Sequence, residues 1–233
     1  MKSLAIIPAR SGSKGIPGKN KMHFDGKPLI SYSIETAIQS KLITDIIVST
    51  DCPEISNIAS KFDGIKLHNR HKNLSSDESP IIETIIQIIN SLNYLPDFVV
   101  LLQPTSPTRT ASEVDEALTI IQSKTEIKSV VSVIRMDDIH PARMYWMSSV
   151  CNKMDSILTN YESTRRQEIP PAFYRNGSIY IARSKDILKE RSMFISPTYG
   201  YEMSNQFWLN IDDKRDVIIA ESILKAWKKN LLS

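Results

Sequence analysis

Short apolar runs alternate along the chain with longer segments in which apolar residues recur every three to four positions. The runs are typical of buried strands and occupy residues 4–7, 45–50, 98–103 and 129–134. The longer segments indicate amphipathic helices over residues 28–40, 53–61, 80–92 and 112–123. This alternation predicts an α/β fold with a mostly parallel central sheet that helices cover on both faces.

The alternation stops after residue 136. Residues 136–172 hold several methionine, arginine and aromatic side chains without a clean period, so we expect an inserted arm there. The pattern then predicts strands over residues 177–183 and 206–211, followed by a last helix capped by Asp212 or Asp213. No linker divides the chain, so residues 1–233 are predicted to form one domain.

The composition narrows the class of protein. The net charge is only +3 and no basic stripe stands out, which argues against a nucleic-acid-binding protein. The apolar runs are much shorter than a membrane span, and the first residues do not read as a signal peptide. Cys52 and Cys151 lack the spacing of a zinc site or a disulfide scaffold, and the four histidines show no metal or triad spacing. We therefore expect a cytoplasmic protein without a nucleic-acid or membrane partner.

Ligands of parallel α/β sheets bind beyond the carboxyl ends of the strands, which points to the loops at residues 9–20, 51–53 and 104–110. The first loop combines glycines with Arg10, Lys14 and Lys19. Glycine lets backbone N–H groups approach phosphate oxygens, and the cations can neutralise a triphosphate and a departing pyrophosphate. The loop is not a Walker A motif, because glycine follows Lys14. Taken alone, it could also be a flexible basic surface loop.

The loop sequence RSGSKGIPGKN, residues 10–20, resembles the signature of the acylneuraminate cytidylyltransferases, also called CMP-sialic acid synthetases. Further matches follow in order, including LLQPTSPTRT at residues 101–110 and RNGSIY at residues 175–180. Together the matches span residue 4 to about residue 216. The resemblance implies a Rossmann-like three-layer nucleotidyltransferase fold with a small inserted dimerisation arm. It also implies transfer of a cytidylyl group from CTP to a nine-carbon 2-keto sugar acid, with release of pyrophosphate.

The same resemblance implies the site residues. Those expected to bind the nucleotide are Arg10, Ser11, Gly12, Ser13, Lys14, Lys19, Asn20, Arg70 and Ser79. Those expected to bind the acceptor are Gln103, Thr105, Ser106, Arg143, Arg166, Tyr180 and Phe194. Those expected to carry catalysis are Arg10, Lys14, Lys19 and Asp212. The chain departs from the family pattern at Ile81, where hydroxyl residues are frequent, and at Met193, where a second aromatic residue is frequent.

A Mg²⁺ or Mn²⁺ cofactor is expected, because nucleotidyl transfer usually needs a divalent cation on the phosphates. The family places Asp-x-Asp late in the chain, where this sequence has Asn210-Ile211-Asp212. Residues two apart in an extended segment point the same way, so Asn210 and Asp212 can face one ion. The alternative is that Asp212 only caps the following helix.

The resemblance further implies a homodimer in which Arg143 and Arg166 of the arm act across the interface. Several alternatives stay open. The acceptor could be N-acetylneuraminate, legionaminate or pseudaminate, whereas the eight-carbon acid Kdo fits the motifs less well. Asn210 favours a non-catalytic nucleotide-binding homologue. A uridylyl- or guanylyltransferase of related fold is disfavoured by the motifs.

Overall fold

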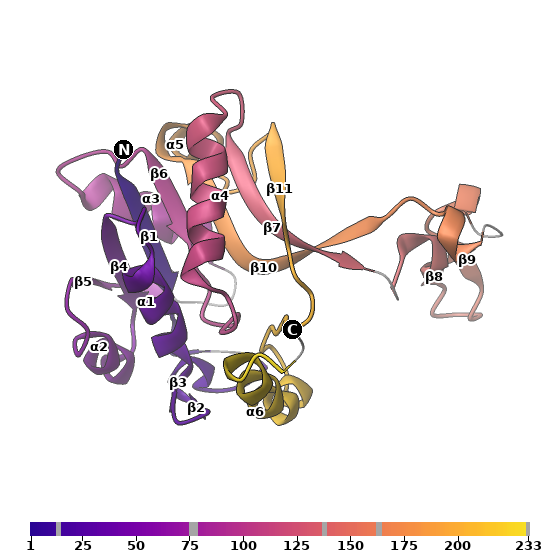
Figure 1. Ribbon diagram of the computed structural model, residues 1–233, viewed down its shortest axis with the longest axis horizontal. Helices are drawn as coiled ribbons and strands as arrows, with labels where there is room; N and C mark the ends of the chain where they lie inside the picture. The colour runs from indigo at the N-terminus through magenta and orange to yellow at the C-terminus, as the bar shows by residue number, and fades with distance from the viewer. Residues whose placement is uncertain (13–14, 75–78, 137–138, 162–164, 232–233) are drawn as a thin grey trace.

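The computed structural model describes residues 1–12, 15–74, 79–136, 139–161 and 165–231. Its centre is a seven-stranded sheet in the order β11-β7-β10-β6-β1-β4-β5 (Figure 1). The strands are β1 (Ser3–Pro8), β4 (Asp45–Thr50), β5 (Ile65–Asn69), β6 (Phe98–Leu101), β7 (Ser129–Met136), β10 (Ala172–Arg183) and β11 (Thr198–Met203). Only β10 runs antiparallel to its two neighbours in this sheet. The predicted, mostly parallel sheet is therefore confirmed.

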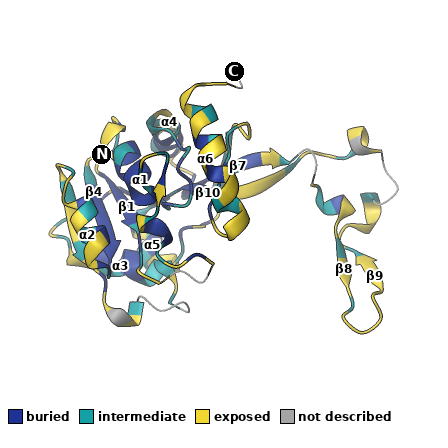
Figure 2. Cartoon of the chain, turned by 90° about the horizontal axis from the view of Figure 1, so that it is seen from below, coloured by how far each residue is buried: buried dark blue, intermediate teal, exposed yellow. Residues whose placement is uncertain are grey.

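Helices cover both faces of the sheet. They are α1 (Leu29–Gln39), α2 (Pro53–Ala59), α3 (Ile81–Ser91), α4 (Ala111–Ser123) and α5 (Ser184–Glu190). The last helix, α6 (Lys214–Lys228), packs instead near the start of α1. Successive side chains of β1 point to opposite faces, so Ala5 and Ile7 pack with α1, α2 and α4, whereas Leu4 and Ile6 pack with α3 and α5. Figure 2 shows the buried strands between these layers. A strand buried on both faces must be apolar throughout, which explains the continuous runs in the sequence.

The predicted strand over residues 206–211 is wrong. That segment is irregular, and Leu209 and Ile211 are apolar because they pack against α6 rather than because they belong to a sheet. The edge strand is instead β11, which pairs in parallel with β7. The sequence hid β11 because an edge strand with exposed polar residues has no apolar run. The prediction also missed β5 and α5.

Residues between β7 and β10 form an arm that projects from the body of the molecule (Figure 1). The ends of β7 and β10 pair as far as Met136 and Ala172 and lead into it. The arm holds a small hairpin of β8 (Tyr145–Met147) and β9 (Met154–Ser156), with short 3-10 turns around it. A second small hairpin, β2 (His23–Phe24) and β3 (Lys27–Pro28), lies between the first loop and α1. Across the described ranges, no helix is long and apolar enough to span a membrane.

Candidate functional site

A cleft of about 490 Å³ opens beyond the carboxyl ends of β1, β5 and β6. Its lining comes from the first loop, from the segment after β5, from the loop after β6 and from the segment before α6. The lining residues are Pro8, Arg10, Gly15, Lys19, Asn20, Arg70, Leu74, Ser79, Ile81, Gln103, Pro104, Thr105, Asn210 and Asp212. Nine of them were expected from the sequence to be site residues: Arg10, Lys19, Asn20, Arg70, Ser79, Gln103, Thr105, Asn210 and Asp212.

One hydrogen bond ties the start of the first loop to β4, and another joins the two ends of the loop to each other. Ala9 N donates to Ser49 O at 2.9 Å, and the Asn20 side chain donates to Arg10 O at 3.3 Å. Glycine is needed at position 15, because a Cβ atom there would lie 2.2 Å from the backbone oxygen of Asp212. The loop and the segment before α6 therefore touch, so a movement of one moves the other.

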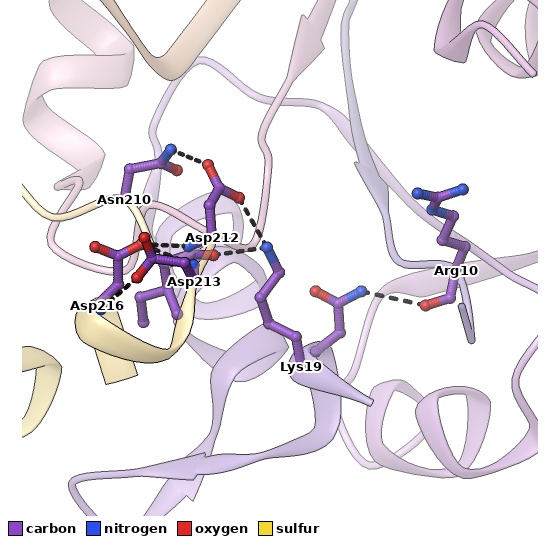
Figure 3. A network of polar contacts seen from close by, with 8 residues as sticks. Arg10, Lys19, Asn210, Asp212, Asp213 and Asp216 are labelled. Carbon is purple, nitrogen blue, oxygen red and sulfur yellow. Dashed lines mark hydrogen bonds and ion pairs between the residues drawn. The ribbon is translucent and has the colours of Figure 1, made fainter. Parts of the chain in front are cut away.

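Lys19 joins the first loop to the other side of the cleft (Figure 3). Its ammonium is largely buried and donates to Ile211 O at 2.6 Å and to Asp212 Oδ1 at 2.8 Å. Asn210 Nδ2 donates to the other carboxylate oxygen of Asp212 at 2.5 Å. The carboxylate of Asp212 thus accepts hydrogen bonds from the Lys19 ammonium and the Asn210 amide. It also contacts solvent, since 62% of the side chain is exposed.

The cap of α6 is Asp213. Its carboxylate accepts from the backbone N–H groups of Arg215 and Asp216, and the Asp216 side chain accepts in return from Asp213 N. This reciprocal arrangement is a capping box. Of the two capping candidates in the sequence, Asp213 is therefore the one that caps, and the side chain of Asp212 lines the cleft.

Arg70 brings a buried positive charge to the cleft. It is 5% exposed, and its guanidinium donates to Ser49 Oγ and Ser49 O at 3.2 Å each. Burial lowers the pKa of Arg70, the Asp51 carboxylate raises it, and Arg10 lowers it. A guanidinium remains charged at neutral pH, so this arrangement attracts an anion to the cleft.

The loop after β6 forms the floor. Ile211 N donates to Thr105 O at 2.9 Å, which ties this loop to the segment before α6. Gln103 and Thr105 are partly exposed to the cleft, whereas Ser106 is buried and is not part of the lining. The two ligand-contacting candidates of this loop are thus Gln103 and Thr105.

Other expected residues lie elsewhere. Ser11 is exposed and bonds to Asp51, and Gly12 is exposed beside it. Tyr180 and Phe194 flank Arg175, whose guanidinium lies 6.0 Å and 5.9 Å from their ring centroids. Arg143 is on the projecting arm. Ser13, Lys14 and the side chain of Arg166 lie outside the described residues.

The sequence did not predict a role for two further residues at or behind the cleft. Gly15 is required by its contact with Asp212, and Arg109 is buried behind Gln103. Both fall within the motifs quoted above, but neither gives a signal on its own. The close approach at Gly15 and the burial of Arg109 both depend on tertiary packing, which the residue type alone does not indicate.

A family model described as Cytidylyltransferase matches residues 4–199. The chain belongs to the cytidylyltransferase family. It is 37% identical to the CMP-N,N'-diacetyllegionaminic acid synthase of Legionella pneumophila, over 97% of both chains. It is 36% identical to the N-acylneuraminate cytidylyltransferase of Streptococcus agalactiae serotype V, over 94% of this chain and 52% of that protein. The cytidylyltransferase chain therefore spans about half the length of some curated relatives that it matches.

The fold of this cytidylyltransferase also has relatives among solved structures. A CMP:2-keto-3-deoxy-manno-octonic acid synthetase complexed with CTP matches 97% of this chain and 99% of its own, with a TM-score of 0.71 at 18% identity. An identity this low supports the fold alone. The Rossmann-like nucleotidyltransferase fold expected from the sequence is confirmed.

Proposed function

We propose that the protein transfers the cytidylyl group of CTP to a nine-carbon 2-keto sugar acid and releases pyrophosphate. The observation that carries the proposal is a single cleft lined by Arg10, Lys19 and Arg70 and by the carboxylate of Asp212. The cations suit a triphosphate, and an exposed carboxylate suits the metal that accompanies it. The names of two relatives, an N-acylneuraminate cytidylyltransferase and a CMP-legionaminate synthase, support the class of acceptor.

The reaction needs no covalent intermediate on the enzyme. The 2-hydroxyl oxygen of the sugar acid would attack the α-phosphorus of CTP and lose its proton to solvent. The bond from that phosphorus to the oxygen that bridges it to the β-phosphorus would break. Arg10 and, as the family resemblance implies, Lys14 would offset the negative charge that grows on the departing pyrophosphate. Gln103 and Thr105 would orient the acceptor. Positioning and electrostatics thus account for the expected rate enhancement.

Mg²⁺ or Mn²⁺ is part of the proposal. The donors fit such an ion, since Asp212 offers carboxylate oxygens and Asn210 a side-chain amide oxygen, and Mg²⁺ prefers oxygen ligands shared with phosphate and water. When bound, the ion would supply positive charge to the phosphate oxygens of CTP. Lys19 would hold Asp212 in place from the opposite side.

A homodimer is also proposed. The arm exposes large apolar side chains, with Trp146, Met147 and Val150 exposed by 70%, 66% and 94%. A projecting element with such side chains suits contact with a second copy of the chain. Arg143 and Arg166 would then belong to the acceptor site of the partner. A cytoplasmic location is inferred as well, because Cys52 and Cys151 are both free.

The test is CTP-dependent pyrophosphate release with a panel of N-acetylneuraminate, legionaminate and pseudaminate, in the presence of Mg²⁺. Turnover with one or more of these acids is expected, and UTP or GTP in place of CTP should give little. No turnover with any acid would contradict the proposal.

A non-catalytic homologue is the second candidate, favoured by the uncharged Asn210 beside Asp212. It would show CTP binding by calorimetry without turnover.

A further inference from the structure

Arg109 is the most buried charged side chain near the cleft. It lies between β6 and the cap of α4, is 2% exposed, and ranks among the largest fully buried side chains of the described residues. It does not line the cleft. A buried guanidinium is costly unless its N–H groups are paired, so its partners indicate what it holds together.

The partners of Arg109 come from three separate segments. Its Nη1 donates to Ser178 O at 2.5 Å and to Gln103 O at 3.3 Å, and its Nη2 donates to Ser33 Oγ at 2.6 Å. Ser33 Oγ in turn donates to Gln103 O at 3.3 Å. The carbonyl of Gln103 therefore accepts from Arg109 and from a hydroxyl that Arg109 itself contacts.

The side chain of Gln103 lies against β10 at Gly177. A Cβ atom at Gly177 would lie 3.3 Å from Gln103 Oε1, and Gly177 has a φ of 77°. Gly177 belongs to a bulge in β10 that the buried Asn176 holds by accepting from Ser132 Oγ at 2.6 Å. Arg109 bonds to the next residue of this bulge, Ser178. It thus fixes both the backbone of Gln103 and the strand against which its side chain rests.

We propose that Arg109 is a positioning residue, which sets the direction in which Gln103 faces the acceptor. The inference deepens the proposed function and rests on the assignment of Gln103 to the acceptor. Burial lowers the pKa of Arg109 to about 9, which leaves it charged at neutral pH. A charged guanidinium with several donors in one plane can hold the carbonyls of Gln103 and Ser178 in a fixed relative orientation. A neutral side chain of the same length cannot do this.

The chain offers a matched control in Arg183. Like Arg109, this residue donates three hydrogen bonds, in its case all to backbone carbonyls, those of Ile127, Ile121 and Lys124, at 2.9, 2.8 and 3.1 Å. It is the last residue of β10, where it pairs with Phe98 at the start of β6, away from the cleft. Arg109→Met and Arg183→Met thus remove similar bonds with different geometric consequences.

The first experiment compares steady-state kinetics of the two variants with the acid that the wild type uses. Arg109→Met should raise KM for the sugar acid about tenfold or more and leave KM for CTP within about twofold. Arg183→Met should leave both within about twofold, and Arg109→Lys should recover part of the loss. Equal changes in both KM values, or the same change in both variants, would overturn the positioning role.

A second readout is independent of turnover. The side-chain amide signal of Gln103 in a ¹H–¹⁵N spectrum, assigned by its loss in Gln103→Glu, should shift in Arg109→Met and Arg109→Lys but not in Arg183→Met. An unchanged signal would overturn the inference even if the enzyme is active. A wild-type protein without turnover would contradict the proposed function alone, because the amide signal still reports on Arg109. If Arg109→Met does not fold, Arg109→Lys carries the comparison.

Discussion

Lys19 Nζ lies 2.8 Å from Asp212 Oδ1, although 193 residues separate the two along the chain. Lys19 also donates to Ile211 O, so one ammonium holds the backbone and the side chain of the segment before α6. The contact links the first loop to the segment before α6 at one side of the cleft. It also gives Lys19 a task apart from any contact with phosphate.

Lys19→Met tests this contact. The change leaves Ile211 O without its donor and Asp212 without its cation, and the free energy of unfolding should fall by about 1–2 kcal/mol, since one partner is exposed. Urea unfolding measures the loss. Lys21→Met is the control, because the ion pair of Lys21 with Glu54 is exposed on both sides and should matter less. Equal losses for the two variants would contradict the structural role of Lys19.

Gly15→Ala tests the close approach of the first loop to Asp212. The added methyl would lie 2.2 Å from Asp212 O, so the loop or the segment before α6 must shift. A displacement of about 1 Å can cost roughly a hundredfold in rate, and kcat/KM should fall by about tenfold to a hundredfold. Gly200→Ala is the control, because the nearest atom to the Cβ position there is 3.6 Å away and the residue does not line the cleft. Similar activities for the two alanine variants would rule out the contact as a constraint.

Ser11→Ala should show a pH dependence. Burial raises the pKa of the Asp51 carboxyl. The hydrogen bonds from the Ser11 hydroxyl and backbone N–H, together with smaller effects of the Asp51 backbone and Arg70, lower it by more, so the net shift is downward. A carboxyl whose pKa is lowered by folding adds stability above its unfolded pKa, near 4, and the addition is lost as the pH falls through the folded pKa. The free energy of unfolding of the variant should therefore fall by at most about 1 kcal/mol at pH 7, because solvent screens the bond from the Ser11 hydroxyl to the Asp51 carboxylate. The loss should be smaller at about pH 3. Ser60→Ala, which removes a bond to a backbone carbonyl, should show no such trend in urea unfolding.

The proposed dimer predicts that Trp146→Glu weakens self-association. A charge on this exposed side chain of the arm would have to be desolvated at an interface, so the dimer should dissociate at higher protein concentration. Light scattering after size-exclusion chromatography measures the mass. Ile218→Glu on α6, which replaces a side chain that is 78% exposed, should leave the mass unchanged. A wild-type protein that is monomeric at micromolar concentration would refute the dimer.

The sequence predicted what depends on local pattern. The apolar runs of β1, β4 and β6 and the periodic helices were visible because burial on both faces or on one stripe dictates residue type. Leu209 and Ile211 misled, since packing against a helix leaves the same apolar signal as a short strand. The positions of Arg70 and Gln103 in the cleft followed from motifs. The role of Gly15 did not, because its contact is with a residue almost two hundred positions away.

Asn210→Asp tests the proposed metal site. Without a divalent cation the change replaces an amide that donates to Asp212 with a second carboxylate, so repulsion should lower the free energy of unfolding by about 1–2 kcal/mol. With saturating Mg²⁺ the same pair of carboxylates should bind the ion more tightly, and a tenfold gain in affinity adds about 1.4 kcal/mol. The rise in melting temperature on adding Mg²⁺ should therefore be larger in the variant than in the wild type. Asp213→Asn is the control, since asparagine keeps the cap of α6 and the position does not line the cleft. If Mg²⁺ shifts Asn210→Asp no more than Asp213→Asn, the ion does not bind between Asn210 and Asp212.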